Sequence, residues 1–461
     1  MAYTRLHVVF MLSYASDLRA ALEFLSSRKD EVIRIRKPVD AKHELAAVYR
    51  MLEGGPVVVF ENVKGYKIPV VSGFFSNRRR VSELLGLDPS DPMQLTLRCG
   101  EALANRVKPR LVGDGACKEV VVKSEVNLMK TLPIMKAALG DAGHYITAGV
   151  VFAKDPETGN RNLSIHRMQV KGPNELRLHI DKGRHLGVIL SKAERMGVPL
   201  EIAVAVGVAP AVMLSSTAKL PLGEDELGVA GAIQGEPVEI VKCDTINAEV
   251  PANAEVVLEG ELLPDVWEDE GPFQEYPGTY SVVSPAPIFR VKAITHRSTP
   301  LFYTVFMRES HMLRGIQGEV AIYRVAKDTS PIVQKVHLTM GSCGRHHAVI
   351  SVKKEIADHE GLQRNIICAV FAAMREADLV IAVDEDVDVY NMSEVEWALA
   401  TRFDAARGLI LVPDARSHEI TPVSREGIRS KMGIDATAPF QMKDRFRRAE
   451  FLKVDLKKYL E

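Results

Sequence analysis

Cysteine is scarce in this chain, with 5 among 461 residues, and no two cysteines have the CxxC spacing of a metal ribbon or redox motif. An odd, scattered set is typical of buried, reduced thiols in a cytosolic protein, so we expect no disulfides and a cytoplasmic location. The five positions are Cys99, Cys117, Cys243, Cys343 and Cys368.

Neither sign of charge dominates, since Lys and Arg number 59 and Asp and Glu number 60, for a net charge of -1. This balance predicts no general attraction to nucleic acid or to an anionic membrane. The sequence also has no run of about 18 apolar residues, the length that a membrane-spanning helix needs. The apolar run in MAYTRLHVVFMLSYASDLR is too short to span a bilayer and has no small-residue cleavage site.

Several common catalytic motifs are absent. There is no GxGxxG, no Walker loop and no GxSxG, which disfavours Rossmann oxidoreductases, P-loop NTPases and α/β-hydrolases. Asp384, Asp386 and Asp388 have the spacing of a calcium loop, but the glycine and distal glutamate of that loop are missing. The adjacent pair His346 and His347 does not have the spacing that places two ligands on one face.

What the chain does contain is typical of a soluble globular protein, with 46% hydrophobic and 26% charged residues. A length of 461 residues predicts two or three domains. Gln and Asn are sparse while Glu, Lys and Arg are plentiful, a tendency of proteins from hot environments.

The hydrophobic patterns divide the chain into three regions of a multidomain α/β and α+β protein. Residues 1–112 alternate helix and strand patterns, which predicts an N-terminal α/β domain. Residues 113–307 contain many short strand-like runs, which favour a β-barrel or sandwich, with one helix at KAERMGVP. Residues 308–461 return to the α/β pattern and end in a basic amphipathic helix, FQMKDRFRRAEFLKVDLKKYL.

The strand-like segment NLSIHRMQ contains polar side chains at alternating positions. In an extended strand Asn162, Ser164 and His166 point one way and Arg167 points the other. An arginine in an otherwise apolar strand needs an anionic partner if it is buried. Taken alone, a segment of this kind is more often an exposed strand face.

A divalent metal site is one interpretation of three residues further along the chain. Asn162, His185 on a glycine-containing turn, and Glu226 in an acidic loop supply an amide oxygen, an imidazole and a carboxylate. This set suits Mn²⁺ or Mg²⁺ better than a structural zinc ion, which favours thiolates or several histidines. Singly, each residue is more often a packed or solvated side chain, and spacing alone does not decide between the two.

The stretch EDEGPFQEYPGTY places two carboxylates on either side of a Gly-Pro turn. Glu270 and Glu275 would raise each other's proton affinity if the turn held them together, which yields an acid that stays protonated near neutral pH. An arginine between them would hold one carboxylate ionised and orient the other. An ordinary acidic surface turn is the alternative.

Together these segments resemble the UbiD-type, prenylated-flavin-dependent decarboxylases. NLSIHRMQ matches the Asn-x-Ser-x-x-Arg segment of that family, and GRHLG its downstream histidine. DELGVAGAIQGEPVEIVKC resembles its glutamate segment, and EGPFQEYPGTY its acid-bearing turn. VDEDVDVYNMSEVEWALATR and SKMGIDAT resemble later family segments, so the similarity runs in order from about Thr147 to the C-terminal region.

The resemblance implies a central flavin-reductase-like split β-barrel between two α/β regions, with a terminal helix that assists oligomerisation as a dimer or hexamer. It implies prenylated FMN, supplied by a flavin prenyltransferase, and Mn²⁺ or Mg²⁺ bridging to the cofactor phosphate, with K⁺ as a further ion. The metal ligands would be Asn162, His185 and Glu226. These ligands would also form part of the cofactor site, together with Thr147, Ser164, Ile165, Arg167, Arg184 and the phosphate-contacting Lys431.

The implied reaction is the non-oxidative decarboxylation of an unsaturated carboxylic acid. Arg167 would position the substrate carboxylate, Glu270 would hold Arg167, and Glu275 would protonate the carbon after CO₂ leaves. Gln274 stands where the family commonly has glycine, and Tyr276 where many members have Trp or His. Both departures concern the substrate pocket rather than the reaction.

The resemblance favours trans-anhydromevalonate 5-phosphate as the substrate, with isopentenyl phosphate as the product, because archaeal relatives of this family include a decarboxylase of that acid. A hot-environment archaeon would not make ubiquinone, which weakens the alternative of a quinone precursor. Its phosphate would need basic side chains such as Arg308 or Arg314. The alternative substrates are aromatic acids such as prenylated 4-hydroxybenzoate. Outside this reaction class, a plain-FMN oxidoreductase or a non-catalytic flavin-binding protein remains open, and a two-metal hydrolase lacks ligands.

Overall fold

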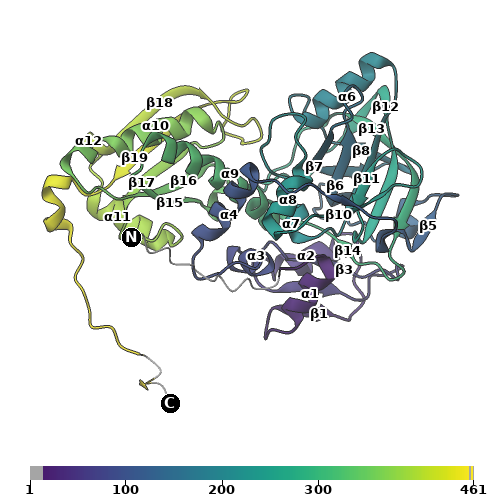
Figure 1. Ribbon diagram of the computed structural model, residues 1–461, viewed down its shortest axis with the longest axis horizontal. Coiled ribbons are helices and arrows are strands. Elements are labelled where there is room, and N and C mark those ends of the chain that lie inside the picture. The colour runs from purple at the N-terminus through teal and green to yellow at the C-terminus, as the bar shows by residue number, and fades with distance from the viewer. Residues whose placement is uncertain (1–13, 456–457, 460–461) are drawn as a thin grey trace, which may run out of the picture. The chain divides into compact units, whose positions relative to one another are not determined.

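The structure is a computed structural model that describes residues 14–455 and 458–459. It divides into two compact units, Met1–Val320 and Ala321–Glu461 (Figure 1). The long helix α9, Met307–Thr329, begins in the first unit and ends in the second. The apolar run near the N-terminus falls largely on residues 1–13, outside the described residues.

The N-terminal part of the first unit has the alternation of helices and strands that the sequence predicts. Its sheet has the order β1–β2–β3–β14, and the VVVF segment that forms β2 is buried throughout. The last strand, β14, joins this sheet only after the chain has passed through the rest of the unit. The strands are β1 Val32–Ile35, β2 Val57–Phe60, β3 Val70–Ser72 and β14 Phe302–Tyr303, and the helices are α1 Leu18–Ser26, α2 Glu44–Arg50, α3 Arg78–Leu84 and α4 Met93–Ala104.

The remainder of the first unit is built on a closed antiparallel barrel of six strands. The order is β12–β9–β6–β7–β8–β13, and β13 pairs back onto β12 to close it. These strands are β6 Tyr145–Lys154, β7 Arg161–Val170, β8 Glu175–Leu178, β9 Leu200–Val206, β12 Val256–Glu270 and β13 Ser284–His296. The short strand β5, Val120–Val122, extends the sheet beside β13, and a small separate sheet contains β4 Arg110–Leu111, β10 Glu239–Lys242 and β11 Glu249–Pro251. The predicted mixed multidomain fold with a central β-barrel is confirmed.

Two sequence expectations about the connections between barrel strands were wrong. His185, expected on a turn, is the first residue of α6, His185–Met196, and Glu226, expected in a loop, is the first residue of α8, Glu226–Gln234. A Cβ on Gly231 would lie 2.7 Å from the Val107 carbonyl oxygen, so glycine lets a neighbouring segment approach α8 closely. Burial rather than an amphipathic pattern therefore stabilises α8. Two further helices are α5 Leu128–Thr131 and α7 Pro210–Ser215.

The second unit contains a five-stranded sheet of order β15–β16–β17–β19–β18, in which β16, β17 and β19 are parallel. Helices α10 and α11 pack on opposite faces, because Gly433 of β19 faces Ile367 of α10 while the next residue, Ile434, joins the core under α11. The strands are β15 Val333–Leu338, β16 His347–Val352, β17 Leu379–Asp384, β18 Leu409–Arg416 and β19 Ile428–Ala436. The helices are α10 Leu362–Ala373, α11 Met392–Arg402 and α12 Ala405–Gly408.

The expected C-terminal amphipathic helix does not form in the described part of the chain. Residues 440–446 are a 3₁₀ helix, and residues 447–455 have no regular secondary structure. Phe451 and Leu452 are 89% and 88% exposed, so these apolar side chains do not pack against residues 14–455 and 458–459. An isolated helix without such packing is marginal in water, which accounts for the difference.

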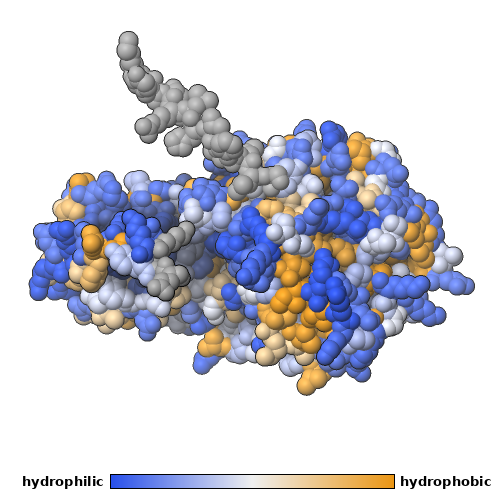
Figure 2. Space-filling view, turned by 90° about the horizontal axis from the view of Figure 1, so that it is seen from below, coloured by the Kyte–Doolittle hydropathy of each residue, from blue (hydrophilic) through white to orange (hydrophobic). Residues whose placement is uncertain are grey.

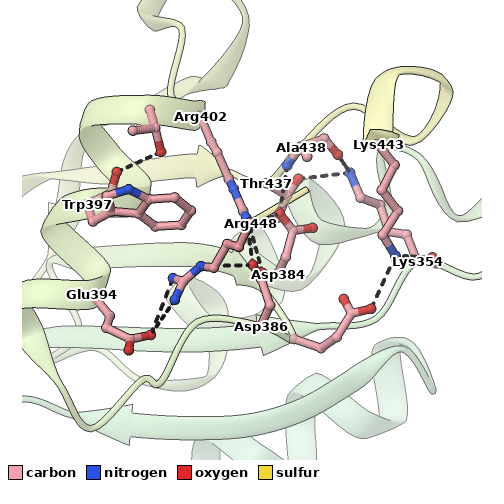
Figure 3. A network of polar contacts seen from close by, with 12 residues as sticks. Lys354, Asp384, Asp386, Glu394, Trp397, Arg402, Thr437, Ala438, Lys443 and Arg448 are labelled. Carbon is pink, nitrogen blue, oxygen red and sulfur yellow. Dashed lines mark hydrogen bonds and ion pairs between the residues drawn. The ribbon is translucent and has the colours of Figure 1, made fainter. Parts of the chain in front are cut away.

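A network of charged residues attaches the start of this terminal segment to the second unit (Figure 3). The Arg448 guanidinium lies 4.0 Å from the Trp397 ring centroid and pairs with Glu394 at 3.3 Å and with Asp386 at 3.2 Å. Arg402 also pairs with Asp386, at 2.7 Å, and its guanidinium lies 4.8 Å from the same ring. The segment is therefore held at Arg448, while the apolar residues that follow it are exposed.

The surface combines hydrophilic areas with hydrophobic patches (Figure 2). On the face drawn in Figure 2, hydrophilic residues dominate and hydrophobic ones gather in patches. Among residues 14–455 and 458–459, no helix is both long enough and apolar enough to cross a membrane. All five cysteines are free; Cys99 and Cys117 are buried as expected, whereas Cys368 is exposed, contrary to expectation.

Candidate active site

The central feature of the barrel is an arginine held between two glutamates. Arg167 of β7 donates two hydrogen bonds to Glu270, from Nε to Oε1 at 3.0 Å and from Nη2 to Oε2 at 2.7 Å. Its third nitrogen, Nη1, forms an ion pair with Glu275. Glu270 is the last residue of β12 and is fully buried. The structure thus brings together the three residues predicted to form the acid–base network.

Backbone contacts hold the turn between the two glutamates. Gly271 has φ of +95°, a conformation that favours glycine, and its N–H donates to the side chain of Gln169 at 3.2 Å. Gln274, the departure from the family pattern, donates its N–H to Asp141 at 2.8 Å. The Glu275 N–H donates to the Thr279 carbonyl at 2.8 Å. These hydrogen bonds hold the backbone that carries Glu275.

Two further side chains, which the sequence did not single out, border the Arg167–Glu270 pair. His179 follows β8 directly, and its Nδ1 lies 3.5 Å from Glu270 Oε2. Phe273, inside the turn, lies under the Arg167 guanidinium at 5.1 Å and packs on Tyr145 at 4.5 Å between ring centroids. The pairing of β7 with β8 accounts for the place of His179, and the local sequence carries no signal for it.

Electrostatics keep Glu270 ionised. Burial raises the pKa of its carboxyl, but hydrogen bonds from His179 and Arg167 and the Arg167 charge outweigh burial and leave the pKa at about 2. Burial, followed by the Glu270 charge, raises the pKa of the Tyr145 phenol. Glu270 is consequently a fixed anion for Arg167 and not a proton donor near neutral pH.

Two of the predicted metal ligands, His185 and Glu226, lie close together, and Glu226 is hydrogen-bonded to the neighbour of the third. Glu226 accepts a hydrogen bond at 2.7 Å from the N–H of Leu163, the neighbour of Asn162 on β7, and its other carboxylate oxygen lies 4.0 Å from His185 Nδ1. Asn162 and Glu226 are 3% and 2% exposed. Within residues 14–455 and 458–459, no three His, Cys, Asp or Glu side chains are arranged to hold a metal ion, so the predicted set would need the Asn162 amide as its third ligand.

The chemistry of this set fits a hard divalent cation. Burial raises the pKa of Glu226 to about 8, and burial lowers the pKa of His185, so without a cation both groups favour their neutral forms. A divalent cation would favour the ionised carboxylate and binds a neutral imidazole. Carboxylate and amide oxygens with one imidazole are ligands suited to Mn²⁺ or Mg²⁺.

A line of hydrogen bonds connects the Asn162 amide with His166 on the same face of β7, as the strand alternation predicts. Asn162 Nδ2 lies 3.3 Å from Ser164 Oγ, and Ser164 Oγ lies 2.9 Å from His166 Nε2. The other ring nitrogen, Nδ1, lies 2.8 Å from the His179 carbonyl oxygen. Burial lowers the pKa of His166 to about 4, which leaves its ring neutral at physiological pH.

The other predicted cofactor residues are distributed over both units. Thr147 Oγ1 lies 2.9 Å from Thr304 Oγ1 and accepts the Val305 N–H at 3.1 Å, while Ile165 is a half-buried residue of β7. Arg184 is the N-cap of α6, and its Nε lies 3.4 Å from Asp181. Lys431 lies on β19 of the second unit, where it is buried and its ammonium donates to backbone carbonyls of Phe371, Met374 and Arg375.

Comparison with known proteins identifies the family. Residues 24–98, 110–309 and 311–436 match models of the N-terminal, Rift-related and C-terminal domains of 3-octaprenyl-4-hydroxybenzoate carboxy-lyase. The chain belongs to the UbiD family. It is a decarboxylase, as the sequence resemblance predicted.

Three relatives show the range of this family. The anhydromevalonate phosphate decarboxylase of Methanothermobacter thermautotrophicus is 37% identical over 92% of this chain and 98% of its own. The UbiD-class enzyme HmfF of Pelotomaculum thermopropionicum in complex with FMN is 43% identical, with a TM-score of 0.93 over 96% of this chain and all of the other. An evolved dimeric form of HmfF contains prenylated FMN. The 3,4-dihydroxybenzoic acid decarboxylase of Klebsiella pneumoniae is 31% identical, with a TM-score of 0.91 over 96% of this chain and 98% of the other.

Proposed function

We propose that this chain is a prenylated-FMN-dependent decarboxylase of an α,β-unsaturated carboxylic acid. The observation that carries the proposal is the arginine held between two glutamates, of which the buried one, Glu270, is ionised. The binding of FMN and prenylated FMN by the related enzyme HmfF supports the cofactor. A flavin prenyltransferase would supply it.

In the proposed mechanism each residue of the network has a distinct task. Arg167, fixed by its two hydrogen bonds to Glu270, presents positive charge to the substrate carboxylate. When bound, prenylated FMN supplies the covalent electron sink that loss of CO₂ from an unsaturated carbon requires. Glu275, which pairs with Arg167 Nη1 as a carboxylate, takes up a proton from solvent and delivers it to the carbon that carried the substrate carboxylate. Because Glu270 stays ionised, Arg167 remains in place while Glu275 changes protonation.

The metal site has a separate task. Asn162, His185 and Glu226 would hold Mn²⁺ or Mg²⁺, which would neutralise the negative charge of the cofactor phosphate. Thr147, Ser164, Ile165 and Arg184 are proposed cofactor contacts, and Lys431 a proposed phosphate contact. K⁺ remains a proposed further ion.

For the substrate we propose trans-anhydromevalonate 5-phosphate, with isopentenyl phosphate as the product. The relative that acts on anhydromevalonate phosphate, at 37% identity, supports this choice. A phosphorylated substrate needs basic side chains near the acid, and α9 carries Arg308 and Arg314. The same helix lies against the Glu275 loop, because His311 Nε2 is 2.8 Å from the Tyr276 carbonyl oxygen.

An aromatic acid is the second candidate substrate. The relative that acts on 3,4-dihydroxybenzoic acid, at 31% identity, favours it. An aromatic substrate has no phosphate, so neutralising Arg308 and Arg314 would leave its KM nearly unchanged. The same double substitution would raise the KM for a phosphorylated acid.

The proposed enzyme is a homo-oligomer, a dimer or a hexamer. The evolved form of HmfF that is described as dimeric supports self-association. So does the terminal segment beyond Arg448, where Phe451 and Leu452 are exposed. In an oligomer these side chains would pack on a second copy of the chain.

The deciding experiment is production of the chain together with a flavin prenyltransferase, followed by mass spectrometry of the released cofactor and a screen of unsaturated acids for CO₂ release. We expect prenylated FMN and activity, and we expect Glu275→Gln to lose at least about 100-fold in kcat while it retains the cofactor. Ordinary FMN alone, in parallel with a family member that loads the prenylated form, would contradict the proposal. Full CO₂ release by Glu275→Gln would show that Glu275 is not the proton donor of the reaction.

A further inference from the structure

The hydrogen bonds between Asn162, Ser164 and His166 have only one consistent direction. The His179 carbonyl can only accept, so the neutral His166 ring carries its hydrogen on Nδ1, which donates at 2.8 Å. Nε2 therefore has a lone pair and accepts the Ser164 hydroxyl hydrogen at 2.9 Å. This leaves Ser164 Oγ as an acceptor towards Asn162.

The direction of these hydrogen bonds decides the orientation of the Asn162 amide. Only the NH₂ group of the amide can donate to Ser164 Oγ, at 3.3 Å, so Nδ2 faces Ser164. The amide oxygen, Oδ1, is then the end of the amide that does not face Ser164, and it is the end that could act as a ligand of a cation. Rotation of the amide by 180° would present NH₂ to the cation instead, which cannot act as a ligand.

We propose that His166 is a positioning residue, which acts through Ser164 to fix the Asn162 amide with its oxygen towards the metal. This inference rests on the proposed function, because it needs the metal at Asn162, His185 and Glu226. The two hydrogen bonds of His166 go to the Ser164 hydroxyl and to the backbone carbonyl of His179, the residue whose ring borders Glu270. The expected effect of His166 is on metal affinity. Residues that orient a metal ligand typically contribute about 10- to 100-fold in affinity.

The chain offers a matched pair of substitutions at position 166. His166→Gln reaches as far as Nε2 and places an amide oxygen where Ser164 needs an acceptor. The shorter side chain of His166→Asn reaches only the position of Nδ1. Its NH₂ group can still donate to the His179 carbonyl, but no acceptor stands at the position of Nε2. Both variants are polar, so a merely structural role for His166 would not give them different Mn²⁺ affinities.

The test measures Mn²⁺ binding by the full chain loaded with FMN, from the electron paramagnetic resonance signal of free Mn²⁺. We expect His166→Asn and His166→Leu to weaken binding about 10-fold or more, and His166→Gln to stay within about 3-fold of the wild type. In a Ser164→Ala background, which lacks the connecting hydroxyl, His166→Leu should have no further effect.

The outcomes separate the two proposals. No Mn²⁺ binding by the FMN-loaded wild type overturns the proposed metal site and this inference with it. Wild-type binding that is unchanged in His166→Asn and His166→Leu overturns the inference alone, as does equal weakening by His166→Gln. If the His166 variants do not fold, Ser164→Ala alone must weaken Mn²⁺ binding to the same extent, and unchanged binding there also overturns the inference.

Discussion

Replacing Glu270 by glutamine should destabilise the first unit in a manner that depends on pH. The ordinary pKa of 4.5 falls to about 2 in the folded protein. This difference corresponds to about 3 kcal/mol of folding free energy at neutral pH. Because the folded pKa is the lower one, the contribution is fully present above pH 4.5 and is lost as pH falls towards 2. Near pH 3, roughly half of it remains.

The expected effect on melting temperature follows from the size of the first unit. Unfolding entropy is about 2 cal/mol/K per residue, which gives about 0.7 kcal/mol/K for a unit of this length. A loss of about 3 kcal/mol therefore lowers the melting temperature by about 4 °C at pH 7. The difference in melting temperature between wild type and Glu270→Gln should decrease as the pH falls from 5 to 3. Differential scanning fluorimetry and circular dichroism would measure it.

Glu239→Gln is the matched control. Glu239 is the first residue of β10 in the same unit and also pairs with an arginine, Arg110, at 2.6 Å, but the two side chains are 41% and 63% exposed. Exposed pairs contribute less than about 1 kcal/mol, so this variant should lower the melting temperature by about 1 °C or less. A Glu270→Gln effect no larger than the Glu239→Gln effect, or a difference in melting temperature that stays constant down to pH 3, would refute the reasoning.

Three other expected outcomes test the site and the terminal segment. Gly271→Ala would place a Cβ 3.2 Å from the Val282 carbonyl oxygen in a left-handed conformation, so it should destabilise the fold by about 1–3 kcal/mol; an unchanged melting temperature would contradict this. Glu226→Gln removes the only carboxylate of the proposed metal set, so Mn²⁺ binding measured by calorimetry should weaken more than about 10-fold, whereas wild-type affinity would exclude Glu226 as a ligand. Removal of residues 447–461 should reduce the oligomer mass seen by light scattering, and an unchanged mass would show that the terminal segment does not assemble the chain.

The sequence by itself determined the regular elements of the barrel and the types of chemical group in the site. The period-two pattern of NLSIHRMQ predicts a strand with Asn162, Ser164 and His166 on one face, because successive residues of a strand alternate faces. The Gly-Pro turn predicts that Glu270 and Glu275 lie close together. Both features are local, so they are encoded within a few residues and do not depend on distant contacts.

Only the tertiary structure decided which distant groups meet. Barrel closure brings Arg167 of β7 to the end of β12, and strand pairing places His179 beside Glu270. Burial stabilises a helix in the segment that begins at Glu226, although this segment has no amphipathic pattern. Residues 447–455 form no helix, because their apolar side chains do not pack against the described residues. In each case the deciding free energy comes from contacts between residues far apart in the chain, which no local pattern contains.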